Sequence, residues 1–238
     1  MQKNQKLLTH KSNQICFTGP RIEQVLKMHP AELEPERMNK IVEEFSRGFH
    51  FLRDFNLAAS FFGSSRAKAK DRMYTEATLL ASLLAKDGFA IITGGGPGIM
   101  EAANKGAVRA GGRSAGINIQ LPHEQRTNKY VKESAAFYYF FIRKVMLAFA
   151  SEVYIFFPGG FGTLDEFFEL ATLVQTKKIE PVPIVLISKN YWNPLLSWVK
   201  EELYTNRKAI EKQDMKIYHV VDNAQEAFEL IQKMVVRA

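Results

Sequence analysis

Short apolar runs with the composition of strands alternate with longer helix-like runs through most of this chain. In the first half the strand-like runs are LAASFFGSS, FAIITGGG and SAGINIQLP, separated by the helix-like runs DRMYTEATLLASLLAKDG and PGIMEAANKGAVRAGG. The second half continues with a mixed aromatic segment and helix over 137–150, VYIFF, a helix over 163–175, VPIVLIS, the helix YWNPLLSWVKEELY, the short strand KIYHVV and a last helix. Buried parallel strands form continuous apolar runs. This order predicts an α/β fold, a doubly wound parallel sheet with helices on both faces.

Residues 1–55 do not join this alternation. They contain the stretch ERMNKIVEEFSRGFHFLRDF, in which apolar residues recur at helical spacing: Ile41, Phe45, Phe49 and Leu52. The sequence therefore predicts an N-terminal helical extension over 1–55, laid on a main domain over 56–238.

Composition excludes several classes of protein. The single cysteine, Cys16, cannot form an internal disulfide, and the five histidines are scattered, so no metal site is predicted. The net charge of +7 is spread without a basic run, which argues against nucleic-acid binding. The polar first residues lack the apolar core of a signal peptide, and no apolar run reaches the roughly 18 residues of a membrane span. A soluble, cytoplasmic protein without membrane contact is expected.

The loop FFGSSR follows the first predicted strand, at the place where open α/β sheets bind ligands. Ser64, Ser65 and Arg66 offer hydroxyl and guanidinium donors to a ligand. A polar turn that caps the next helix would need the same kind of residues. Both interpretations of Ser64 stay open.

The loop ITGGGPGIM lies between the second strand and its helix and carries Gly94, Gly95, Gly96 and Gly98. Exposed N–H groups at a helix start attract an anion, and four glycines in five positions exceed what one tight turn needs. The dinucleotide fingerprint GxGxxG would need glycine where Ile99 stands, and no acid ends the following strand to hold a ribose. The motif GxxxxGK[ST] is also missing from the sequence. A phosphorylated ligand smaller than NAD is therefore predicted.

The loop in FFPGGFGTLDEFFEL runs from a buried strand into a helix. Gly159, Gly160 and Gly162 allow a ligand to approach the backbone closely, and the acids that follow lie within one helical turn. Thr163 and Glu166 also have the spacing of a capping box. Spacing alone does not separate a helix cap from a catalytic acid.

In YYFFIRKVMLAFA, the cation Arg143 lies on an apolar stripe with Phe140, Met146 and Leu147. It could snorkel, form a buried ion pair, or point into a pocket that accepts an anion or a polar substrate. The stretch is too apolar on every side for a surface helix, so we expect a second copy of the chain to cover one face.

Three motifs, GGGPGIMEAANKGA, the Arg143–Lys144 pair and PGGFGTLDE, together resemble the LOG ("lonely guy") family over roughly residues 57–222. These are cytokinin riboside 5′-monophosphate phosphoribohydrolases, sometimes mislabelled as lysine decarboxylases. The resemblance implies a Rossmann-like fold, a homodimer, no cofactor, and hydrolysis of AMP or N6-substituted AMP to free base and ribose 5-phosphate. The first glycine loop and the extension over 1–55 differ from the short plant-like members, and the extension resembles that of longer bacterial relatives.

The resemblance places the family's catalytic pair on Arg143 and Glu166. The predicted substrate-binding residues are Glu124, Lys144, Gly159, Gly160, Gly162, Thr163, Ser64 and Gly96. The alternatives are a nucleotide or molybdenum-cofactor carrier without turnover and a Rossmann oxidoreductase. The presence of both Arg143 and Glu166 favours an enzyme over a carrier.

Overall fold

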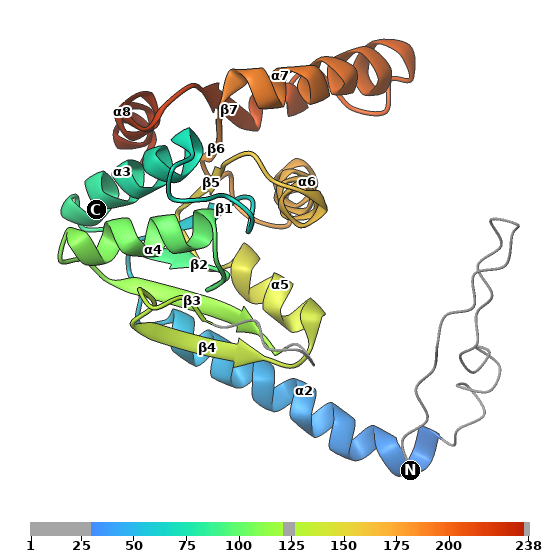
Figure 1. Ribbon diagram of the computed structural model, residues 1–238. Helices are drawn as coiled ribbons and strands as arrows, with labels where there is room; N and C mark the ends of the chain where they lie inside the picture. Colours follow the sequence, from blue (N-terminus) through green and yellow to red (C-terminus); the bar gives the residue numbers. More distant parts are fainter. Residues whose placement is uncertain (1–29, 121–126, 236–238) are drawn as a thin grey trace, which may run out of the picture. The chain divides into compact units, whose positions relative to one another are not determined.

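One parallel sheet organises the chain (Figure 1). The computed structural model describes residues 30–120 and 127–235. Within them seven strands lie in the order β4-β3-β2-β1-β5-β6-β7, and all neighbouring pairs are parallel. The strands are β1 (Ala58–Phe62), β2 (Ala90–Thr93), β3 (Ser114–Ile119), β4 (Glu133–Phe137), β5 (Val153–Phe156), β6 (Ile184–Ile187) and β7 (Tyr218–Val221).

Helices cover both faces of this sheet (Figure 1). One face carries α3 (Arg72–Lys86), α4 (Ile99–Arg109) and α8 (Ala224–Met234), whose apolar side chains share one buried cluster with Phe61, Ile91 and Ile155. The other face carries α5 (Phe140–Ala148), α6 (Phe161–Gln175) and α7 (Lys189–Trp198). There the ring of Phe167 contacts Phe156 of β5 and Trp192 of α7, with centroids 5.8 and 5.3 Å apart. The predicted doubly wound α/β fold is confirmed.

The strand order reverses between β1 and β5. The chain moves outward from β1 to β2 and β3 on one side, and from β5 to β6 and β7 on the other. Phe62 at the end of β1 pairs with Phe156 at the end of β5. The loops that follow β1 and β5, far apart in the sequence, therefore leave the sheet side by side at its carboxyl edge, which is where this class of sheet binds ligands.

The helix at the N-terminal side, α2, spans Pro30–Leu52 and begins before the predicted helical stretch. Contacts between residues divide the chain into two units, Met1–Val42 and Glu43–Ala238. Residues 43–52 of α2 thus belong to the same unit as the sheet. The division of roles between residues 1–55 and 56–238 stays a prediction.

Three elements differ from the sequence-based expectation. The strand β4 was not predicted, because its sequence ESAAF has no β-branched residue and only one aromatic residue, Phe137. The helix α7 passes directly into the π-helix η1 (Val199–Asn206), and the short 3-10 helix η2 (Asp214–Lys216) precedes β7. The sequence predicts η1 as part of a single helix and does not indicate η2, because neither a π-helix nor a short 3-10 helix has a distinct sequence pattern.

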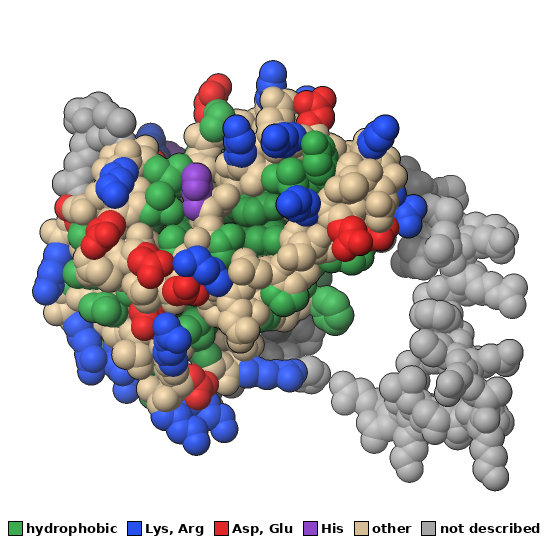
Figure 2. Space-filling view, turned by 90° about the horizontal axis from the view of Figure 1, so that it is seen from above, with side chains coloured by type: hydrophobic (Ala, Val, Ile, Leu, Met, Phe, Trp, Pro, Cys, Tyr) green, Lys and Arg blue, Asp and Glu red, His purple; other side chains and the backbone are tan. Residues whose placement is uncertain are grey.

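The surface shown in Figure 2 carries Lys and Arg side chains scattered among acidic and apolar ones. Over the described ranges, no helix combines the length and the apolarity that a membrane crossing requires.

Candidate active site

A cleft of about 900 Å³ opens at the carboxyl ends of β1 and β5. Its polar lining includes Ser64, Arg143, Gly160, Gly162, Thr163 and Glu166. Its apolar lining includes Phe62, Met100, Ile119, Phe140 and Leu147. The sheet reversal therefore brings together most of the predicted site residues.

Backbone contacts connect the three loops that follow β1, β2 and β5 beside the cleft. The N–H of Ser64 donates to the carbonyl of Pro158 at 3.0 Å, and the N–H of Ile99 donates to the carbonyl of Ser64 at 3.0 Å. Gly98 has φ +72°, and a Cβ at this position would overlap the Ser64 carbonyl oxygen. The hydroxyl of Ser64 accepts from the N–H of Arg66 at 3.1 Å while the residue lines the cleft. Both interpretations of Ser64, a turn residue and a cleft residue, are thus compatible with its position.

The start of α6 lacks a side-chain cap. Gly160 is its N-cap residue, and its carbonyl accepts from the N–H groups of Thr163 and Leu164 at 3.0 and 3.1 Å. The N–H groups of Phe161 and Gly162 precede these bonds, and both residues line the cleft. Such a helix start is suited to binding an anion.

The structure rules out the capping-box interpretation of Thr163 and Glu166. Because α6 begins at Phe161, Thr163 is its third residue and Glu166 its sixth, so the glutamate lies in the second turn, beyond the N-cap. The glycines of the loop also differ in their surroundings. A Cβ at Gly159 would overlap the hydroxyl of Thr163, but a Cβ at Gly160 or Gly162 would meet nothing within 4 Å. Packing therefore does not explain the last two glycines, whereas close approach of a ligand would.

Arg143 projects from α5 toward this cleft. Its Nε donates to the carbonyl of Ile117 on β3 at 2.9 Å. The guanidinium also lies so close to Gly94 that a Cβ there would overlap its Nη2. Burial lowers the pKa of Arg143, and the charge of Glu166 opposes that shift. One edge of the guanidinium is held by the sheet, which leaves the remaining donors for a ligand.

Glu166 is a buried carboxyl, with only 6% of its surface exposed. Burial raises its pKa to about 7, from an ordinary value of 4.5. The cations Lys144 and Arg143 lower this pKa, and the anions Glu169 and Asp165 raise it. A carboxyl that titrates near neutrality in a cleft has the electrostatics of a catalytic group.

Comparisons with known proteins agree with these motifs. A family model described as "Possible lysine decarboxylase" matches residues 100–231. A protein of Oryza sativa subsp. japonica named as a probable cytokinin riboside 5′-monophosphate phosphoribohydrolase is 30% identical over 185 residues, 76% of this chain and 72% of that protein. A cytokinin riboside 5′-monophosphate phosphoribohydrolase of Arabidopsis thaliana is 31% identical over 186 residues, 76% of this chain and 77% of that protein. The chain belongs to the LOG family.

Solved structures share the fold of this LOG-family chain. The molybdenum cofactor binding protein of Rippkaea orientalis aligns with a TM-score of 0.55 at 24% identity, covering 76% of this chain and 96% of that one. The molybdenum cofactor carrier protein of Chlamydomonas reinhardtii aligns with a TM-score of 0.56 at 20% identity, covering 75% and 97%. At these identities the likeness concerns the fold alone.

In the LOG-family chain, Lys144 faces away from the main cleft. Its Nζ forms ion pairs with Asp165 at 2.5 Å and Glu169 at 3.1 Å, which connect α5 to α6 and border a second, smaller hollow. Burial acts to lower the pKa of Lys144, but the hydrogen bonds to these two carboxylates outweigh burial and raise it. The lysine thus holds the helix that carries Glu166, and a direct contact with substrate stays a prediction.

One further predicted residue, Gly96, does not line the cleft. Gly96 is buried beside the cleft, and its carbonyl accepts from Nδ2 of Asn128 at 2.9 Å. Gly94, which was part of the predicted loop but outside the predicted substrate-binding set, lines the cleft instead. Glu124 lies outside the described residues.

Sequence reasoning missed two residues that shape the site. The hydroxyl of Tyr191 at the start of α7 donates to the carbonyl of Gly159 at 2.7 Å, and Tyr191 also lines the cleft. The amide of Asn128 donates to the carbonyls of Gly95 and Gly96 at 3.2 and 2.9 Å and so fixes the first glycine loop. Both residues act over long sequence separations, and no local pattern marks them.

Within the described ranges, no group of three or more His, Cys, Asp or Glu side chains is placed to hold a metal ion.

Proposed function

We propose that the chain hydrolyses the N-glycosidic bond of a purine nucleoside 5′-monophosphate, either AMP or an N6-substituted AMP, to free base and ribose 5-phosphate. The observation that carries this proposal is the cleft itself. It combines a buried glutamate with a pKa of about 7, an arginine held by the sheet, and a helix start without a side-chain cap. The names of the relatives point to the same reaction.

The 5′-phosphate is assigned to the start of α6. The N–H groups of Phe161 and Gly162 and the positive end of the helix dipole favour an anion there. Glu166 follows in the next turn. A phosphate and a carboxylate repel each other, so they address different ends of one ligand, and Glu166 is left to act on the ribose.

In the proposed reaction the bond between ribose C1′ and the base nitrogen breaks through an oxocarbenium-like transition state. The ionised Glu166 stabilises the positive charge on the ribose or orients the attacking water, and Arg143 binds polar groups of the nucleotide and assists departure of the base. Water supplies its oxygen to C1′, and one proton leaves with the base. Asp165 and Glu169 are both ion-paired with Lys144, so direct attack by water is favoured over a covalent intermediate.

A carrier without turnover is the alternative function. It is supported by the shared fold of the molybdenum cofactor binding protein and the molybdenum cofactor carrier protein. A carrier would bind its ligand and return it unchanged, so product analysis separates the two functions.

The chain is expected to release adenine from AMP at a kcat/KM at least about a hundredfold higher than from adenosine. Adenosine has no phosphate to bind at the start of α6, and hydrogen bonds to a charged group contribute about 1.5–3 kcal/mol each to binding. Chromatography of parallel incubations measures free adenine, and ribose 5-phosphate serves as a competitor that should inhibit. Equal turnover of adenosine, or no inhibition by ribose 5-phosphate, would contradict the phosphate site.

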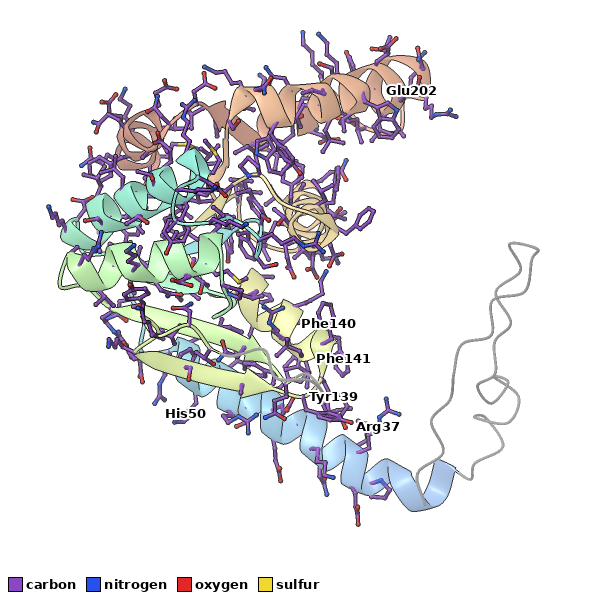
Figure 3. All side chains as sticks on the ribbon, in the orientation of Figure 1. Arg37, His50, Tyr139, Phe140, Phe141 and Glu202 are labelled. Atoms are coloured by element: carbon purple, nitrogen blue, oxygen red, sulfur yellow. The ribbon has the colours of Figure 1, made fainter. Side chains whose placement is uncertain are left out.

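We also propose that a second copy of the chain covers an aromatic surface around the start of α5. Tyr139, Phe140 and Phe141 lie together there (Figure 3). The large exposed side chains of this surface are Phe49, Tyr138, Phe140, Phe141 and Phe149, each between 47% and 67% exposed. Exposed aromatic patches mark interaction sites, and twofold homodimers are the commonest assemblies. Because Phe140 also lines the cleft, the dimer interface would lie close to the site.

Light scattering at micromolar concentration is expected to give twice the monomer mass of 27.1 kDa. Phe141→Asp should shift the equilibrium toward monomer, because it places a charge in the proposed interface. Leu79→Asp is the matched control, since Leu79 on α3 is 47% exposed, as is Phe141. A monomeric wild type, or equal effects of the two substitutions, would be inconsistent with this interface.

A further inference from the structure

Glu44 on α2 has an unusual position for a carboxylate. Only 8% of its surface is exposed. Its Oε1 accepts from the backbone N–H of Tyr138 at 2.7 Å, and its Oε2 accepts from the backbone N–H of Tyr139 at 3.1 Å. Tyr139 is the N-cap residue of α5, so the carboxylate of one helix binds the start of another.

The helix α5 contributes no acid of its own to its start. The N-cap residue makes no side-chain capping bond, and the first turn contains no Asp or Glu. The helix has nine residues, and Arg143 is its fourth, so this cation lies at the end of the first turn, where it opposes the helix dipole. Glu44 supplies the missing negative charge. It takes the role that the glutamate of a capping box has within a single helix.

A short chain of contacts links Glu44 to Arg143. Glu44 holds the backbone of Tyr139, and the carbonyl of Tyr139 accepts from the N–H of Arg143 at 3.2 Å. One turn further along α2, a Cβ at Gly48 would overlap Sδ of Met146, so the two helices are in close contact. Arg47 donates to the carbonyl of Ala136 on β4 at 2.8 Å. Residues 44–48 therefore fix the corner between β4 and α5.

We infer that Glu44 is a positioning residue for the reaction, which acts by fixing the α5 start and thereby the direction of the Arg143 guanidinium. This inference rests on the proposed function, because it takes Arg143 as a group that contacts the nucleotide. It gives residues 43–52 of α2 a part in activity, although they precede the 100–231 segment that the family model matches.

Kinetics with AMP test the inference through a double-mutant cycle. Glu44→Ala should lower kcat/KM by roughly ten- to hundredfold, since displacements of about 1 Å in a catalytic group have effects of this size. In the Arg143→Ala background the same substitution should change kcat/KM by less than about twofold, because no positioned arginine remains. Glu43→Ala, a change at the exposed neighbour on the same helix, is the control and should have no effect.

A purely structural role for Glu44 predicts a different pattern. It would lower kcat/KM by the same factor in both backgrounds, and that result would overturn the inference, as would an unchanged kcat/KM in the Glu44→Ala protein. Glu44→Gln keeps the size of the side chain and one acceptor, and it replaces Glu44→Ala in the cycle if the alanine variant does not fold.

A measurement without turnover separates this inference from the proposed function. In protein labelled with ¹⁵N-arginine, the Nε–H resonance of Arg143 is assigned by its loss in Arg143→Ala. Glu44→Gln should shift this resonance or speed its exchange with solvent, because the hydrogen bond to the Ile117 carbonyl loosens. Glu43→Ala should leave it unchanged. A shift without AMP cleavage supports the positioning role while the proposed function fails, and an unchanged resonance refutes the positioning role even if AMP is cleaved.

Discussion

Glu166→Gln is expected to lower release of adenine from AMP by about 10²–10⁴-fold, the range that a positioned acid or base contributes. Gln has the same size but carries no charge, so it neither stabilises an oxocarbenium ion nor accepts a proton from water. The glutamate is not a helix cap, and its removal does not open the start of α6. Steady-state kinetics with AMP measure the effect. Glu201→Gln, in the π-helix outside the cleft lining, is the control. An active Glu166→Gln protein would remove this residue from the mechanism.

The same variant should be more stable than wild type at alkaline pH. The folded protein holds the pKa of Glu166 at about 7, above its ordinary value of 4.5, so folding favours the protonated carboxyl. The stability that this group contributes is present below about pH 4.5 and is lost as the pH rises through about 7. The loss is on the order of 3 kcal/mol, and Gln, which does not titrate, avoids it. Denaturation of both proteins at about pH 5 and about pH 8 measures the difference. A difference in stability that does not grow with pH would contradict the buried, titrating carboxyl.

Arg143→Ala and Arg143→Lys are both expected to lower kcat/KM for AMP by at least about a hundredfold, the effect of removing one preorganised donor. Lysine keeps the charge, but it has no Nε–H for the Ile117 carbonyl and no planar fork for the nucleotide. Steady-state kinetics with AMP measure both variants. Arg109→Lys, at an exposed position in the last turn of α4, is the control for a general effect of replacing arginine by lysine. A fully active Arg143→Lys protein would show that only the charge matters.

The strand and helix order was predictable because most strands are covered on both faces. Such strands form continuous apolar runs, as in β1, β5 and β6, where every residue is buried. The edge strand β4 is only partly buried, so its composition carries little signal, and its pairing with β3 defines it instead. The first turn of α6 was misplaced because Thr163 and Glu166 have the spacing of a cap without its geometry.

The site was predictable where the type of a residue does not fit the structural role that its sequence neighbours indicate. Arg143 on an apolar stripe and the glycines before Glu166 are of this kind. Glu44 is also a charged residue on an otherwise apolar helical stripe, with Ile41, Phe45 and Gly48. Only the structure shows that its carboxylate binds the backbone N–H groups at the start of α5. Contacts such as that of Tyr191 with Gly159 join distant parts of the chain and have no local pattern.

The central claim is that this cleft cleaves a nucleoside 5′-monophosphate and does not merely bind it. The most direct measurement is chromatography of the full chain incubated with AMP and, in parallel, with N6-isopentenyl-AMP, GMP and CMP. The account predicts free base and ribose 5-phosphate in equal amounts from AMP or its N6-substituted form, and at least about a hundredfold slower release with Glu166→Gln. Recovery of AMP and its N6-substituted form intact, from a protein shown by calorimetry to bind them, would contradict the account and favour a carrier.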